Sequence, residues 1–414
     1  MKGSLKLGRM LTVGRKTTTP VPITTSVRKL KIPRRQDMLI DGMTAEDTKG
    51  TINAEWVDYK PYKDTSEVAE RVILYVHGGA YVIGSRRMYR MMTWRLSKHA
   101  NARVLAVDYR LAPEATFPLP LHDVISAYAY LIDPPAGSGL PKYKPEQISF
   151  VGDSAGGGLL TGTMLYLRDS GCLPLPGAAS CFSPYYDLTH AFPSWYLNAS
   201  IDFVPDYADD PKLLHKNRSQ GYLDSNEDIL NPYACPTMSV ESSTQIPPML
   251  IQVGDADRLR DDAIVFSESS FPNSPIRVEV YQHMPHVFQF FAPVYSFSEH
   301  ALMRIGQFVN EQTGKQVLNR PEVNHELLFI EYTPGFPIHT VPDAMGIVDD
   351  GVRLLVQKGV WTEDMKDTSL LVTKAGANIV RKQAGSTSTA IAAKTDVFQK
   401  LSVDSQQHSD ATLV

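Results

Sequence analysis

The stretch ISFVGDSAGGGLL at residues 148–160 constrains the fold of this chain more than any other part of its sequence. Its first residues are apolar and predict a buried strand, while residues 157–167 are compatible with a helix. Ser154 lies between them in the pattern Gly-x-Ser-x-Gly, which is typical of a sharp strand-to-helix turn that exposes a nucleophilic hydroxyl. Taken alone, the pattern fits a glycine-rich turn without chemistry equally well.

The segments before and after this turn alternate between strands and helices. Apolar runs predict further strands at residues 72–76, 104–109, 178–182, 249–253 and 276–281, the last of the series. Helical spacing follows at residues 88–100, 122–132 and 299–311. We interpret the polar residues 55–62 as a lead into the main domain. The alternation predicts an α/β fold with a mostly parallel sheet and helices on both faces.

Four polar or glycine-rich stretches follow predicted strands directly. They are His77-Gly78-Gly79-Ala80, the turn at Ser154, the acidic run around Asp257 and the segment around His286. In parallel sheets, functional sites form beyond the carboxyl ends of the strands. We therefore expect these four stretches to meet at one edge of the sheet.

The residue types in these stretches suit nucleophilic catalysis. A serine needs a base to take its proton, and the base needs a carboxylate to fix its tautomer. Ser154, Asp257 and His286 follow one another in the order Ser, Asp, His that strand–turn–helix nucleophiles use. The residue chemistry alone leaves other acids and another base open: Asp255, Asp261, Asp262 and His283.

A developing oxyanion needs hydrogen-bond donors from the main chain. We expect these from Gly78, Gly79 and Ala155, and removing one such donor costs on the order of 3 kcal/mol of barrier. His77 is expected to hold the glycine loop in place rather than act as a base.

Composition excludes several classes of function. The 414 residues carry a formal net charge of −4, which gives no support for nucleic-acid binding. No apolar run approaches the ~18 residues of a membrane span. Three cysteines, an odd number without metal-ligand spacing, favour a reducing compartment, and we expect no metal site. Cytoplasmic location is therefore the first expectation, with a mitochondrial one as alternative, since residues 1–36 are basic and free of acids.

Together the motifs resemble those of the hormone-sensitive-lipase-like family of α/β-hydrolases over roughly residues 70–312. The resemblance rests on His77-Gly78-Gly79-Ala80, the DYRLAPE of residues 108–114, Phe117-Pro118, the GDSAGG of residues 152–157, the DRLRD of residues 257–261 and His286-Val287-Phe288. It implies an α/β-hydrolase fold and an esterase that works through an acyl-enzyme without a cofactor on small-to-medium hydrophobic esters.

The resemblance also implies roles for single residues. It selects Asp257 as the acid and His286 as the base, and it gives Asp153 the task of ordering the turn. A cap built from the N-terminal arm and an insertion would cover the site. Four aromatic residues of the insertion are candidates for the lining of an acyl pocket, with ordinary packing of the cap as the alternative: Trp195, Tyr196, Phe203 and Tyr207.

These interpretations predict three parts of the chain. Residues 1–62 form a basic N-terminal arm, either solvated or packed as a helix over the site, and residues 63–314 the catalytic domain, with the cap insertion at 188–245. Residues 315–414 form an extension with one helix at 344–356 and a polar tail, disordered after about residue 375. The alternatives to an esterase are a non-catalytic small-molecule receptor on the same fold, or an amide hydrolase or acyltransferase with the same triad.

Overall fold

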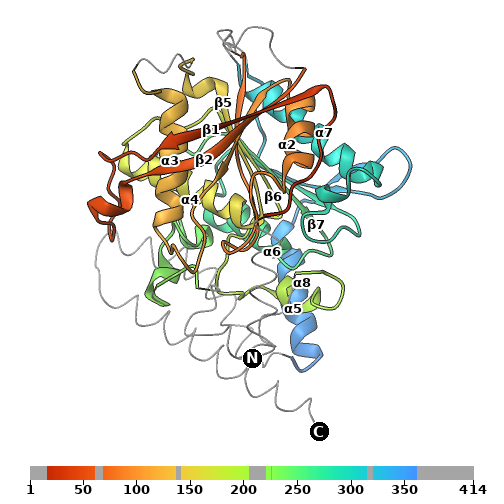
Figure 1. Ribbon diagram of the computed structural model, residues 1–414. Helices are drawn as coiled ribbons and strands as arrows, with labels where there is room; N and C mark the ends of the chain where they lie inside the picture. The colour runs from red at the N-terminus through yellow and green to blue at the C-terminus, as the bar shows by residue number, and fades with distance from the viewer. Residues whose placement is uncertain are drawn as a thin grey trace, which may run out of the picture.

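Ten strands of the chain join in one twisted sheet in the computed structural model, which describes residues 16–60, 69–136, 141–204, 221–224, 226–314 and 320–360 (Figure 1). The strand order is β1-β2-β4-β3-β5-β6-β7-β8-β9-β10. Strands β3 to β9 run parallel, and β1, β2 and β10 are antiparallel to their neighbours. The predicted α/β class is confirmed.

Most predicted elements lie within a few residues of their expected positions. The strands are β1 (Thr25–Pro33), β2 (Thr51–Tyr59), β3 (Val72–Val76), β4 (Arg103–Asp108), β5 (Ile148–Asp153), β6 (Ala178–Phe182), β7 (Met249–Gly254), β8 (Ile276–Tyr281), β9 (Glu326–Ile330) and β10 (Ile338–Thr340). The helices are α2 (Arg90–His99), α3 (Leu119–Ile132), α4 (Ser154–Ser170), α5 (Pro193–Leu197), α6 (Arg260–Val265), α7 (Ser296–Gln312) and α8 (Ala344–Gln357).

The sheet is buried between two layers of helices. Helices α3 and α4 pack together on one face, and α2 and α7 on the other (Figure 1). Strand β3 shows the consequence: Leu74 joins the core under α3 and α4, whereas Ile73 and Tyr75 join the core under α2 and α7. Successive side chains of a strand point to opposite faces, so a central strand with helices on both sides is apolar throughout.

The N-terminal segment differs from the prediction. Its described part includes β1, which pairs with β2 as an edge hairpin instead of forming a solvated arm or a helix over the site. Strand β2 in turn pairs with β4, so residues 55–59 of the expected polar lead are part of the sheet. The sequence did not indicate this strand because Glu55 is charged and charged residues are usually exposed. In the structure Glu55 is fully buried, and its carboxylate pairs with Arg90 at 2.8 Å.

The sheet also continues beyond the strand expected to be last. Strand β9 pairs in parallel with β8, and β10 closes that edge. The predicted boundaries at residues 62 and 314 therefore cut across the sheet. Helix α8 is present as expected and packs against α5 and α6, while the tail after residue 375 lies outside the described residues.

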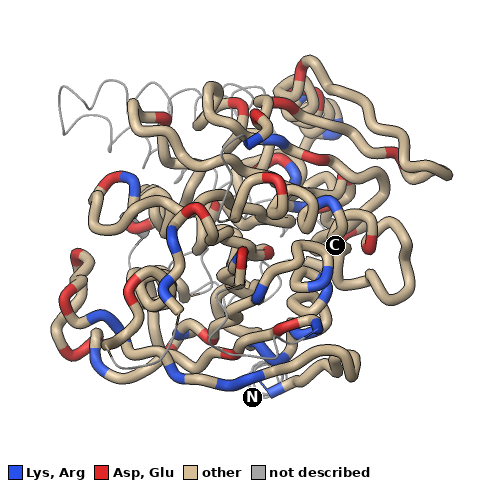
Figure 2. Tube along the Cα trace, turned by 90° about the horizontal axis from the view of Figure 1, so that it is seen from above, with Lys and Arg blue, Asp and Glu red and all other residues tan. Residues whose placement is uncertain are grey.

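Charges of both signs are interspersed along the described trace (Figure 2). This distribution matches the near balance of 41 Lys and Arg against 45 Asp and Glu. Among the described helices, none is long and apolar enough to cross a bilayer.

Candidate active site

Ser154 stands at the sharp turn where β5 passes into α4. Its φ of 49° lies in the left-handed region that non-glycine residues rarely adopt. The turn brings the start of α4 against the end of β3, where a Cβ on Gly156 would lie 2.1 Å from the carbonyl oxygen of Val76. Small residues are thus required around the serine, as the motif predicts.

Ser154, His286 and Asp257 come together beyond the carboxyl ends of β5, β8 and β7. The His286 Nε2 atom lies 3.0 Å from Ser154 Oγ, and its Nδ1 atom lies 3.2 Å from Asp257 Oδ1. Asp257 is fully buried, and its Oδ1 also accepts the main-chain N–H of Leu259 at 2.8 Å. This is the spatial order that nucleophile, base and acid require.

The other acids and the second histidine have different partners. The Asp255 carboxylate accepts the N–H of His283 at 2.6 Å. Asp261 accepts the N–H of Ser194, and Asp262 accepts the main-chain N–H groups of residues 186 and 187. Of the four candidate acids, only Asp257 hydrogen-bonds the imidazole of His286.

The glycine loop after β3 lies against the serine turn, but its first glycine is already bound. The Gly78 N–H donates to Asp153 Oδ1 at 3.0 Å, and a Cβ on this glycine would lie 2.3 Å from Asp153 Oδ2. Within the described residues, no acceptor is recorded for the N–H of Gly79 or of the following Ala80, which has a left-handed φ of 53°. Consecutive amides of this kind form an anion-binding nest, so Ala80 is a donor candidate that the sequence analysis missed.

Comparison with known proteins places this arrangement in a family. Residues 73–290 match the family model described as alpha/beta hydrolase fold. An acetyl-hydrolase of Streptomyces hygroscopicus is 34% identical over 269 residues, which are 65% of this chain and 83% of that protein. The chain belongs to the α/β-hydrolases.

Similar solved structures include esterases, one of them from the hormone-sensitive lipase family that the sequence motifs indicated. An esterase crystal structure soaked with p-nitrophenyl butyrate is 31% identical, with a TM-score of 0.59 over 74% of this chain and 91% of that one. An esterase of the bacterial hormone-sensitive lipase family is 30% identical, with a TM-score of 0.54 over 75% of this chain and 99% of that one. The predictions of a hormone-sensitive-lipase-like α/β-hydrolase and of a carboxylic-ester hydrolase are therefore confirmed.

In this hydrolase, His77 supports the glycine loop. Burial lowers its pKa to about 4, so the ring is neutral at physiological pH. Its Nδ1–H donates to the Gly78 carbonyl oxygen at 2.7 Å, and its ring stacks on Tyr109 at a centroid distance of 4.6 Å. Through these contacts the ring connects the glycine loop to Tyr109.

Asp153 connects the glycine loop to the sheet. Its Oδ1 accepts the Tyr75 hydroxyl at 2.6 Å in addition to the Gly78 N–H. Complete burial raises the pKa of this carboxyl to about 6, although those two hydrogen bonds lower it. Asp153 thus ties β5, β3 and the loop together behind the serine.

Opposing effects set the pKa of His286. Burial alone lowers it, but the charge and hydrogen bond of Asp257 raise it. Asp202 and Asp153 raise it further, so that the net pKa lies above the ordinary value of 6.5. The surroundings therefore favour the imidazolium, the form that a base reaches after taking the serine proton.

The predicted pocket residues occupy different places. Trp195 is buried, with its ring between His190 and the Arg258 guanidinium, whose Cζ lies 4.0 Å from the ring centroid. Tyr196 packs against α8. Phe203 alone lies beside the triad, with its ring centroid 6.1 Å from that of His286, and Tyr207 lies outside the described residues.

Asp202 is a further residue near the triad, and its carboxylate contacts the main chain of the loops that carry Asp257 and His286. Asp202 Oδ1 accepts the N–H of His286 at 3.2 Å, and Oδ2 accepts the N–H of Arg258 at 2.7 Å. It belongs to no motif and lies in the insertion among other scattered aspartates, so no sequence signal distinguished it.

Proposed function

We propose that this α/β-hydrolase cleaves small-to-medium hydrophobic carboxylic esters through an acyl-enzyme formed on Ser154. The observation that carries the proposal is the continuous contact from Ser154 Oγ to His286 Nε2 at 3.0 Å and from His286 Nδ1 to Asp257 Oδ1 at 3.2 Å. Histidine is the only side chain with an ordinary pKa near neutrality, and here it is placed between a nucleophile and an orienting acid.

In the first half of the reaction, Ser154 Oγ attacks the ester carbonyl carbon while His286 Nε2 takes the hydroxyl proton. Asp257 holds the Nδ1–H of the imidazole and stabilises the positive charge that forms on it. The carbonyl oxygen becomes an oxyanion beside the amides of Gly79, Ala80 and Ala155. The intermediate then expels the alcohol, which leaves with the proton from His286.

In the second half, water attacks the acyl carbon and gives a proton to His286. Collapse of the second tetrahedral intermediate breaks the bond to Ser154 Oγ, and the serine recovers the proton from His286. The products are one acid and one alcohol for each ester and water consumed, so no cofactor enters the balance.

The short-to-medium acyl preference rests on two relatives and one side chain. One relative carries the name acetyl-hydrolase, and a solved esterase was soaked with a butyrate ester. Phe203 is 57% exposed beside His286 and offers an apolar contact to a bound ester.

Labelling with a fluorophosphonate probe and substitution of the serine test the proposal together. The folded protein is expected to be labelled at Ser154, and Ser154→Ala to remove labelling and lower kcat by a factor on the order of 10⁶ with little change in melting temperature. Retained turnover in Ser154→Ala would refute the nucleophile assignment.

A substrate panel distinguishes the alternatives. We expect p-nitrophenyl acetate and butyrate to be cleaved faster than the octanoate and far faster than matching anilides. Faster cleavage of anilides would identify an amide hydrolase, and acyl transfer to an added alcohol in preference to water would identify an acyltransferase. A receptor is not favoured, because several relatives carry the names acetyl-hydrolase, ethyl acetate hydrolase or esterase and the three triad side chains are present.

We also propose that the enzyme works in the cytoplasm. All three of its cysteines are free, two of them buried, which suits a reducing compartment. Fractionation of cells that express the tagged full-length chain tests this location.

A further inference from the structure

Residues 194–204, which follow the start of α5, are fastened to the loop that carries the triad acid. The Asn198 side-chain amide donates to the carbonyl oxygens of Asp255 and Asp257 at 3.0 and 2.8 Å. The Ser194 hydroxyl donates to the Arg258 carbonyl oxygen at 2.9 Å. This part of the insertion is thus held against the catalytic machinery by side-chain-to-main-chain hydrogen bonds rather than by apolar packing alone.

Asp202 extends this attachment from the acid to the base. Its Oδ2 accepts the N–H of Arg258, the residue that directly follows Asp257, and its Oδ1 accepts the N–H of His286 itself. One carboxylate therefore joins the loop after β7 to the loop after β8. The separation of these loops determines the 3.2 Å between Asp257 and the imidazole.

The same carboxylate places a second negative charge near the base. One carboxylate oxygen of Asp202, one of Asp257 and a ring nitrogen of His286 all lie within 4.8 Å of one another. Burial and the charge of Asp257 raise the pKa of Asp202, whereas His286 and the two main-chain donors lower it.

Two other charged residues, Asp153 and Arg258, lie near Asp202 and His286. Asp153, at the end of β5, also acts on His286. The Arg258 guanidinium stacks on Trp195 and donates to the carbonyl oxygens of Trp195 and Val204.

We propose that Asp202 is a positioning residue of the triad, which holds the Asp257 and His286 loops in register and adds a second carboxylate beside the imidazole. The proposal rests on the proposed function, since it assigns Asp202 a task in the same reaction. It gives the insertion a part in catalysis that is separate from covering the substrate.

The kinetic test compares Asp202→Asn and Asp202→Ala with the wild type. The asparagine keeps one acceptor oxygen but removes the charge, and the alanine removes both. We expect kcat on p-nitrophenyl butyrate to fall about 10- to 100-fold, since small displacements of catalytic groups have effects of this size, with a smaller change in KM. The acid limb of the kcat/KM profile is expected to shift to lower pH in both variants, because a charge that favours the imidazolium is lost.

Asp255→Asn is the matched control. The Asp255 carboxylate accepts the N–H of His283 through one oxygen, and the asparagine oxygen can keep this bond, whereas Asp202 uses both of its oxygens. The carboxylates that raise the pKa of His286 are those of Asp257, Asp202 and Asp153. We expect kcat of this variant to stay within about twofold of the wild type, and its pH profile to be unchanged. A loss of melting temperature alone in the Asp202 variants, with wild-type kcat and an unmoved acid limb, would overturn the proposal.

A second measurement does not depend on turnover. Titration of ¹³C-labelled histidines by NMR, with His286 assigned from the spectrum of His286→Gln, reports the protonation of the base directly. We expect a lower pKa of His286 in Asp202→Asn and no change in Asp255→Asn. If the wild type cleaves no ester but the His286 titration still shifts, the proposed function fails and the coupling to Asp202 stands; an unshifted titration rejects the coupling.

Discussion

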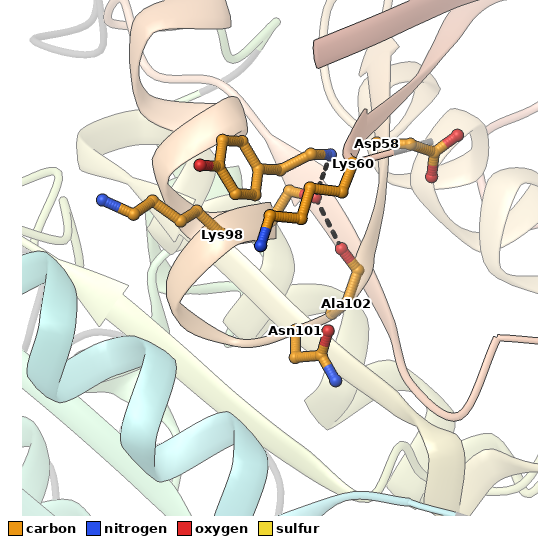
Figure 3. A pocket seen from close by; sticks show the side chains of 7 residues that line it. Asp58, Lys60, Lys98, Asn101 and Ala102 are labelled. Carbon is orange, nitrogen blue, oxygen red and sulfur yellow. Dashed lines mark hydrogen bonds between the residues drawn. The ribbon is translucent and has the colours of Figure 1, made fainter. Parts of the chain in front are cut away.

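Two buried serines, at opposite rims of the same sheet, show what distinguishes a site from a hollow. Ser154 lies at the carboxyl ends of the parallel strands, and its Oγ faces the imidazole of His286. Ser97 lies at the amino ends, at the end of α2, where its Oγ accepts the Tyr59 N–H at 2.9 Å and donates to the Ala102 carbonyl oxygen at 2.7 Å (Figure 3). The first hydroxyl has a base to activate it, and the second is occupied by main-chain groups.

The surroundings of the two serines differ in the same sense. The hollow beside Ser97 is lined by Asp58, Tyr59, Lys60, Ser97, Lys98, Asn101 and Ala102 (Figure 3). It contains no histidine, and its acid Asp58 is paired with Arg103 at 2.9 Å. Left-handed φ values occur at both rims: at Lys60 and Asn101 beside the hollow, and at Ala80, Ser154, Ser183 and Val287 beside the triad. Backbone strain is therefore common to both rims, and the base beside the serine is what identifies the active one.

Among the substitutions that test this contrast, replacement of the triad acid is expected to lower kcat the most. Asp257→Asn is expected to lower kcat about 10⁴-fold near neutral pH, because the amide no longer fixes the productive tautomer of His286. The residual activity should have an acid limb at lower pH than the wild type, since loss of the Asp257 charge lowers the pKa of His286. Steady-state kinetics from pH 5 to pH 9 measure both effects; an unchanged kcat would place the acid elsewhere.

A substitution in the glycine loop after β3 is expected to have an intermediate effect on kcat. In Gly78→Ala the new Cβ would lie 2.3 Å from Asp153 Oδ2 and 3.0 Å from Ser154 Cβ, so the loop must move away from the serine. We expect kcat to fall about 10²- to 10³-fold, the loss associated with one misplaced oxyanion donor.

Gly171→Ala provides the control for backbone strain. Gly171 caps α4 at φ 63°, and a Cβ there would meet nothing within 4 Å. This variant is expected to lose about 1 kcal/mol of unfolding free energy without a change in kcat. Equal losses of activity in both glycine variants would show that the loop after β3 has no special place in the reaction.

The active rim could be predicted from the sequence because each of its motifs lies close in sequence to the strand that positions it. Each triad residue lies at most five residues after the end of an apolar strand, and parallel strands bring their carboxyl ends to one edge. The choice of Asp257 over three neighbouring aspartates needed the family resemblance at first, and the geometry then separated them by their partners. Short motifs thus contain enough information when the groups they bring together lie at equivalent ends of neighbouring strands.

What escaped prediction depends on contacts between distant segments. Strand β2 could not be predicted because the charge of Glu55 is neutralised by Arg90, which lies 35 residues away in the sequence. The occupation of the Gly78 amide by Asp153 and the bridging role of Asp202 are set by how loops face each other, and no periodicity or motif records this. For Trp195 and Tyr196 the sequence left a pocket and cap packing open, and in the structure Trp195 stacks on Arg258 and Tyr196 packs against α8.

For the serine at the inactive rim, the expected effect of substitution is on stability and not on turnover. Ser97→Ala leaves the Tyr59 N–H and the Ala102 carbonyl oxygen without their partner, and such a loss costs about 1–3 kcal/mol of unfolding free energy. Urea denaturation measures this cost, and kcat on p-nitrophenyl butyrate is expected to stay within about twofold of the wild type. A tenfold fall in kcat at full folding would break the contrast between the rims, because it would mean that the junction of β2, α2 and β4 transmits its geometry across the sheet to Ser154.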